Sequence, residues 1–288
     1  MSLIRTISED GTTMRTIARE HVHLAVWFLL LAHTLLSRLA AYPVAEWATL
    51  IASTNLMVLV AFLAIFHLLT DDPETAPATR SDYILLGIVA LGVSVGGLFG
   101  STYDVPFLMA GLAGYYISRH ARIGSSGSVG LVYLALFVNG FLAPLIFMLY
   151  KDIFLIGEVD LAVRLNALVG ITVAGDGTLI TGESGMRLRM VGACSVFTNL
   201  SYAFLGYASV KAFFRLPLKS SDIVVLLVLS LLLMVMNSAR LGLMTPSRSA
   251  YEFWHGGEGA VIVSAVQMAL ICAISVLSVA RSGALWRA

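Results

Sequence analysis

The sequence contains little cysteine and little charge. Only two of its 288 residues are cysteines, Cys194 and Cys272, and neither lies in a CxxC or Cys/His ligand spacing. This pattern argues against a disulfide framework or a zinc site, and we expect no metal and no cofactor. Charged residues make up 12% of the chain, the formal net charge is +1, and no run of Lys and Arg occurs. Nucleic acid is therefore not an expected partner.

Hydrophobic residues are abundant instead. They make up 58% of the chain, and the mean hydropathy is +0.89, which predicts a single all-α polytopic membrane domain over residues 1–288 in a lipid bilayer. About 20 apolar residues cross roughly 30 Å of hydrocarbon, and about eight stretches reach or approach that length. The eight predicted transmembrane helices cover residues 21–42, 45–69, 83–101, 104–119, 128–150, 192–213, 222–244 and 257–280. The fourth is the shortest and contains Gly111 and Gly114, so the span count depends on it.

The distribution of basic residues predicts the orientation. Residues 1–20 are polar and mixed in charge, and we interpret them as a retained cytoplasmic tail. With eight spans and both termini inside, eleven of the eighteen basic residues fall on the cytoplasmic face. These are Arg5, Arg15, Arg19, Arg80, Arg119, Arg122, Lys211, Arg215, Lys219, Arg281 and Arg287. The sixth and eighth spans then begin outside, and the seventh ends outside.

The region of about residues 151–191 is the only long polar segment. Its later part alternates apolar and polar residues around Gly-Asp-Gly and Gly-Glu-Ser-Gly turns, which predicts a small extracytoplasmic β ribbon before the sixth helix. Such a ribbon could roof a site or offer an edge to an extended peptide. A simple capping loop is the alternative interpretation.

Cys194 lies at the predicted outer end of the sixth span. Near the first turn of a helix, the positive end of the macrodipole favours a thiolate, so Cys194 could be a nucleophile. The alternative is a small thiol packed between helices. Cys272 lies mid-span without polar neighbours and fits that second description.

Arg240 follows the apolar run VVLLVLSLLLMVM at the outer end of the seventh span. A guanidinium there is costly unless it is paired, snorkels or lines a polar cavity, so it indicates a functional site. Asn237 lies three residues earlier and could orient it. Interfacial snorkelling is the alternative. Possible charge partners are Glu252, Glu258 and Asp176.

His255 precedes the eighth span in the segment YEFWHGGEG. A helix amino terminus favours the neutral imidazole, which can act as a base. Gly259 is predicted to lie on the same helical face and to leave room for a close neighbour. Alternatively, His255 belongs with Trp254 to an interfacial aromatic belt.

Together these residues resemble the exosortase and archaeosortase family of integral membrane cysteine proteases and transpeptidases. The resemblance rests on ACSVFTNL around Cys194, on NSAR for Asn-x-x-Arg and on HGGEG for His-x-x-x-Gly. It covers about residues 130–280, an exosortase-like core. The sequence departs from the family after Ser195, where Val196 and Phe197 replace the usual Gly-Leu, and this puts the substrate in doubt more than the mechanism.

The resemblance implies a hydrolase that acts on peptide bonds in protein sorting at a bacterial cytoplasmic (inner) membrane. Its substrates would be membrane-anchored exported proteins with C-terminal sorting tails. Cys194 would be the nucleophile, His255 the proton carrier, and Arg240 a group that stabilises the oxyanion or holds substrate. The acceptor would be water or an amine of a surface polymer or lipid.

Two other classes of function compete with this interpretation. One is a non-catalytic transporter or assembly partner in surface polymer export, in which Arg240 binds an anionic ligand; Arg187 and Arg189 nearby give it some support. The other is an intramembrane serine protease or metalloprotease. The sequence has no HExxH, no GxSxG and no intramembrane Asp pair, so this class has little support.

Overall fold

The computed structural model describes residues 4–7, 14–40, 43–46, 55–71, 77–99, 104–119 and 126–281. The chain divides into two compact units, residues 1–137 with 208–217 and residues 138–207 with 218–288. Parts of the predicted N-terminal tail, together with Arg122 and Arg287, lie outside the described residues.

Unit 1 is a helical bundle with a short hairpin. Its elements are β1 (Ile4–Ile7), β2 (Met14–Ile17), α1 (Arg19–Ala40), η1 (Val44–Glu46), α3 (Leu56–Asp71), α4 (Arg80–Phe99), α5 (Asp104–Ser118) and α6 (Ser126–Phe137). Helix α1 packs against α4, and α5 packs against α6. Asp82 is fully buried at the start of α4, where it accepts hydrogen bonds from Arg19 Nε at 2.8 Å and from the Tyr115 hydroxyl. This carboxylate therefore ties together the ends of α1, α4 and α5.

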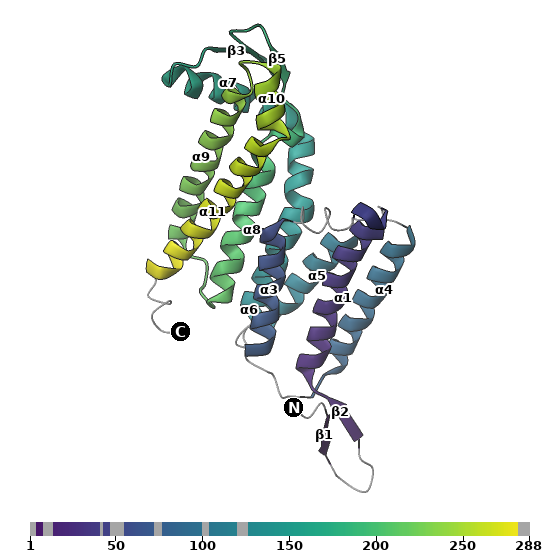
Figure 1. The fold of residues 1–288 in the computed structure, drawn as a ribbon. Helices are drawn as coiled ribbons and strands as arrows, with labels where there is room; N and C mark the ends of the chain where they lie inside the picture. Colours follow the sequence, from purple (N-terminus) through teal and green to yellow (C-terminus); the bar gives the residue numbers. More distant parts are fainter. Residues whose placement is uncertain are drawn as a thin grey trace. The chain divides into compact units, whose positions relative to one another are not determined.

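Unit 2 contains the predicted β region and the last helices (Figure 1). Its elements are η2 (Val138–Leu142), α7 (Ala143–Leu168), β3 (Val173–Asp176), β4 (Leu179–Gly182), β5 (Arg187–Arg189), η3 (Gly192–Cys194), α8 (Phe197–Phe213), α9 (Ser220–Leu243), α10 (Arg248–His255) and α11 (Glu258–Arg281). The end of α8, from residue 208, belongs to unit 1. The sheet and α10 lie at one end of α9 and α11, opposite the C-terminal end of α11 (Figure 1).

The helical, membrane-spanning character predicted from the sequence is confirmed, whereas the count of eight spans is not. Each predicted stretch overlaps a described helix. Among the described residues, three helices are long and apolar enough to cross a membrane: Ser126–Leu168, Ser220–Leu243 and Glu258–Arg281. Leu56–Asp71 and Val105–Ser118 are shorter apolar helices. The chain is therefore a multi-pass membrane protein.

The predicted ribbon forms, but it begins later than residue 151. Helix α7 continues to Leu168, with a local break at Tyr150, whose φ and ψ are −120° and 16°. Charged residues such as Glu158 and Arg164 gave this stretch its polar appearance, yet they lie on a helix whose buried positions are Leu155, Val159, Ala162 and Asn166. The charged residues of this stretch therefore lie between the buried positions of a helix and do not belong to strands.

The sheet itself is a three-stranded antiparallel meander in the order β3-β4-β5. Both predicted turns are present: Gly177 has a φ of 57° between β3 and β4, and Gly185 has a φ of 78° before β5. These backbone conformations favour glycine. A Cβ on Gly182 would lie 2.6 Å from the Thr245 carbonyl oxygen, so the sheet packs directly on the turn that follows α9.

Helices α7 and α9 are in close contact at Gly242. The buried Asn166 amide donates to the carbonyls of Ala162 and Ser238, each at 2.8 Å, and a Cβ on Gly242 would overlap that amide. We expect Gly242→Ala to lower the free energy of unfolding by about 2–5 kcal/mol, because the amide must move and lose a buried hydrogen bond. Thermal unfolding in a mild detergent measures this effect.

Gly157→Ala is the matched control for that experiment. Gly157 lies in α7, and a Cβ there would meet nothing within 4 Å. Alanine favours a helix over glycine by about 1 kcal/mol, so this variant should be as stable as wild type or more so. Equal stability of the two variants would contradict the proposed close packing at Gly242.

Candidate active site

Cys194 lies where the sheet returns to the helices. The chain leaves β5, forms the short helix η3 and then enters α8 at Phe197. The cysteine is 8% exposed and belongs to an apolar cluster with Met190, Leu241 and Met244. Asn237 donates from Nδ2 to the Cys194 carbonyl at 3.0 Å. The sixth and seventh predicted spans therefore meet at the cysteine.

Glu158 is a site residue that the sequence analysis missed. Its carboxylate accepts hydrogen bonds from the Ser195 hydroxyl, from the Val196 amide at 2.9 Å and from Asn237 Nδ2 at 3.3 Å. It thereby fixes the two residues after Cys194 to α7. An ionisable side chain within a hydrophobic helical stretch was the available signal, but it was hidden because residue 158 was assigned to the ribbon.

The same carboxylate corrects the helix-dipole argument for Cys194. The cysteine lies three residues before α8 rather than in its first turn. Ser195 Oγ accepts from the Phe197 amide at 3.1 Å, and Glu158 accepts from the Val196 amide. The acidic side chain at the amino end of α8 is therefore that of Glu158, and the dipole of that helix is not directed at the thiol.

Arg240 binds the backbone at the end of α10. Its Nε donates to the Trp254 carbonyl at 2.9 Å and its Nη2 to the His255 carbonyl at 3.1 Å. None of the three acids considered as partners, Glu252, Glu258 and Asp176, forms an ion pair with it in the described structure; Glu252 pairs with Arg248 at 3.0 Å. Arg240 thus holds the residue that carries the imidazole, and no carboxylate among the described residues forms an ion pair with it.

His255 ends a helix that the sequence analysis did not predict. The eight-residue α10 begins after Ser247, whose hydroxyl accepts from the Ala250 amide at 3.1 Å. The imidazole therefore lies at a helix carboxyl end, and the argument from a helix amino end does not hold. Its ring stacks on Tyr251 with centroids 4.7 Å apart and planes at 20°, which restricts its orientation.

Gly259 has the close neighbour expected of it, although it lies on α11 and not on one helical face with His255. A Cβ at Gly259 would lie 2.7 Å from ring atoms of both Phe253 and Trp254. This contact brings the start of α11 against α10. It supports the segment whose Trp254 carbonyl binds Arg240.

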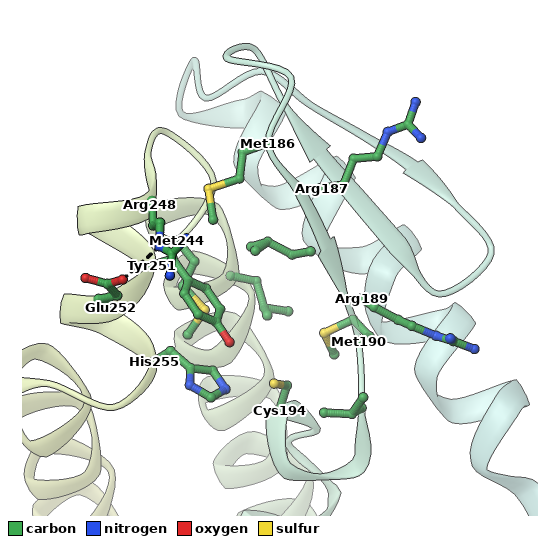
Figure 2. A pocket seen from close by; sticks show the side chains of 13 residues that line it. Met186, Arg187, Arg189, Met190, Cys194, Met244, Arg248, Tyr251, Glu252 and His255 are labelled. Carbon is green, nitrogen blue, oxygen red and sulfur yellow. Dashed lines mark hydrogen bonds and ion pairs between the residues drawn. The ribbon is translucent and has the colours of Figure 1, made fainter.

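A pocket of about 560 Å³ joins these elements. Its lining comes from β5, the segment before α8, the end of α9, and α10. The residues are Met186, Arg187, Leu188, Arg189, Met190, Val191, Cys194, Leu241, Met244, Arg248, Tyr251, Glu252 and His255. Figure 2 shows the Cys194 sulfur on the side that faces His255, while the guanidinium groups of Arg187 and Arg189 point away from both.

Two side chains with reactive chemistry share this pocket. Cys194 and His255 line one mainly apolar cavity, as the nucleophile and the base of a covalent mechanism would. No group of three or more His, Cys, Asp or Glu side chains in the described part of the chain could hold a metal ion.

Comparison with protein families identifies the chain's relatives. The model of the family described as transmembrane exosortase (Exosortase_EpsH) matches residues 47–272. The chain belongs to the transmembrane exosortase family. No curated protein and no solved structure matches the chain. The match includes all of the exosortase pocket and begins well before residue 130, so the family likeness extends beyond the predicted core to α3, α4 and α5.

Replacing the Glu158 carboxyl group by an amide should loosen the exosortase site. In Glu158→Gln an amide nitrogen replaces one acceptor oxygen and faces the Ser195 hydroxyl or the Val196 amide, both of which are donors. We expect the free energy of unfolding to fall by about 2–4 kcal/mol, because buried donors lose their partner. Thermal unfolding and the iodoacetamide reaction rate of Cys194 measure the loss.

Asp160→Asn provides the matched control for this change. Asp160 is exposed on the same helix, two residues from Glu158. It should unfold at the wild-type temperature and keep the wild-type thiol reaction rate. If Glu158→Gln behaves like this control, the carboxylate does not hold the Cys194 segment.

Proposed function

We propose that this chain is a membrane-embedded cysteine protease or transpeptidase that cleaves C-terminal sorting tails of exported proteins. One observation carries the proposal: a chain of the transmembrane exosortase family has Cys194 and His255 lining one pocket. The proposed location is a bacterial inner membrane, with both termini in the cytoplasm and the pocket facing outside.

The reaction would proceed through a thioester. His255 takes the Cys194 thiol proton, and the sulfur attacks the scissile carbonyl carbon to form a tetrahedral oxyanion. The C–N bond then breaks, and the imidazolium returns its proton to the leaving amine. Water or an acceptor amine, such as one on a surface polymer or lipid, attacks the thioester and releases the thiol.

Arg240 would act in two ways. Its contacts with the Trp254 and His255 carbonyls hold the base in place. Arg240 does not itself line the pocket, but its Nη1 has no hydrogen-bond acceptor within the described residues, and in this proposal it donates to a developing oxyanion or to a substrate carbonyl. Asn237 donates to the Cys194 carbonyl and to Glu158, and Ser195 donates to Glu158. These hydrogen bonds would hold the Cys194 thiol in a fixed position.

Mapping the C-termini of exported proteins tests the proposal. Cells with and without the chain would be compared by mass spectrometry of secreted and membrane fractions. We expect a set of truncated or conjugated C-termini that disappears without the chain, and these termini name the substrates. If no C-terminus depends on the chain, the protease proposal fails and a transport or assembly role takes its place.

A further inference from the structure

Among the described strands, none pairs with the outer edge of β5. Its hydrogen bonds to the β4 side use Met186, whose carbonyl accepts from Gly182 at 3.0 Å, and Met190, whose amide donates to Thr178 at 2.8 Å. Backbone groups alternate in direction along a strand. The N–H and C=O groups of Arg187 and Arg189 therefore face away from β4, and no described strand pairs with them.

This unpaired edge belongs to the strand that lines the pocket. Met186, Leu188 and Met190 share one face of β5, and Figure 2 shows Met186 and Met190 directed into the pocket while both arginines point outward. Five residues after Arg189 the chain reaches Cys194, which lines the same pocket. A polypeptide lying along this edge would lead toward the thiol.

We propose that the free edge of β5 binds the substrate polypeptide as an added strand. This inference rests on the proposed protease function and specifies how the substrate is held. The segment before the scissile amide would run parallel to β5, with its main chain bonded to the backbone of Arg187 and Arg189. Alternate side chains would enter the pocket beside Met186 and Met190, and the scissile carbonyl would reach Cys194.

The direction follows from the position of the sheet. The sheet and α10 lie beyond the ends of α9 and α11 (Figure 1). In a tail that continues into a membrane helix, the part after the scissile amide must enter the bilayer. The part before it must then lie on the sheet side of Cys194, where β5 runs. Strand β5 and the bound substrate segment both run toward Cys194 in the amino-to-carboxyl direction. The two strands therefore pair in parallel.

The positive charges on β5 favour pairing with a different polypeptide and disfavour pairing with the β5 strand of a second copy of this chain. Arg187 and Arg189 are exposed on β5, and pairing two β5 strands would place like charges opposite each other. A lipid chain offers no main-chain donors or acceptors for the edge. The methionines tolerate varied apolar side chains because their side chains are flexible, so main-chain pairing would supply much of the binding.

A proline scan of the edge tests the inference on the full chain in nanodiscs. Arg189→Pro removes the outward N–H and blocks the edge without breaking the β4–β5 ladder, because that N–H does not bond to β4. Arg189→Ala is the reference, since it removes the same guanidinium and keeps the N–H. The probe is acetyl-Leu-Ala-Leu-Ala chloromethyl ketone, whose carbon forms a bond to the Cys194 sulfur as chloride leaves. Iodoacetamide reports reactivity without a peptide.

We expect the ratio of peptide to iodoacetamide rates to be at least about tenfold lower in Arg189→Pro than in Arg189→Ala, the scale of one or two lost hydrogen bonds. A second measurement needs no variant. N-methylation of each probe amide in turn should slow labelling of the wild-type chain only at alternate residues, since alternate amides face β5.

Equal ratios in the two variants, or N-methyl effects without that alternation, would overturn the strand-addition inference. Both results leave the proposed function standing if Cys194 still reacts and C-termini still depend on the chain. Failure of the proposed function shows itself differently, as a Cys194 thiol inert even to iodoacetamide and exported proteins with unchanged C-termini.

Discussion

Cys194→Ser should abolish tail processing, with a fall of about 10⁴-fold or more in the cleavage rate. A serine hydroxyl is a far weaker nucleophile than a thiol unless a strong base activates it. His255 has no carboxylate bonded to its ring among the described residues, so the site lacks the third member that serine proteases use. Release of a sorting tail in proteoliposomes measures the rate.

Cys272→Ser is the matched control for the loss of Cys194. Cys272 is the only other cysteine and lies in the middle of α11. This variant should cleave at the wild-type rate, and both variants should accumulate to the wild-type level. If Cys194→Ser processed tails at more than a small fraction of the wild-type rate, Cys194 would have only a packing role.

Arg240→Lys should reduce cleavage by about 10²–10³-fold, although it keeps the charge. The planar guanidinium spans two carbonyls, those of Trp254 and His255, whereas an ammonium group is a single point that cannot reproduce this fork. A displacement of about 1 Å at a catalytic group can cost 10²-fold. Single-turnover cleavage of a reporter tail in proteoliposomes gives the chemical rate.

Arg281→Lys makes the same substitution at the exposed, opposite end of α11. It should leave the cleavage rate within twofold of wild type. The Arg240 prediction fails if Arg240→Lys also stays within that range, because a positive charge alone would then suffice.

Local patterns in the sequence predicted the features that local chemistry determines. Gly177 and Gly185 mark the two turns because left-handed backbone favours glycine, and the apolar stretches mark helices because the bilayer requires them. Counting helix directions brought Cys194, Arg240 and His255 to one end. The turns and helices need only nearby residues, whereas the count of helix directions needs every span between the three positions.

Contacts between distant residues decided what the sequence did not reveal. Glu158 resembles any other charge in a polar stretch until Ser195 and Val196, in the segment before α8, bond to it. Three acids were considered as possible partners of Arg240, but the helix that supplies its carbonyl partners was not recognised. A local signal for α10 did exist in Ser247, a favoured N-cap residue, but only eight residues follow it before the next turn.

The hydrogen bonds between Arg240 and the end of α10 also imply an order of events during synthesis. The thiol of Cys194 leaves the ribosome some sixty residues before His255, and Gly259 and the rest of α11 follow later still. In a nascent chain Cys194 is therefore made before the residues of α10 that line the other side of its pocket. The pocket lining is complete only once synthesis has reached His255.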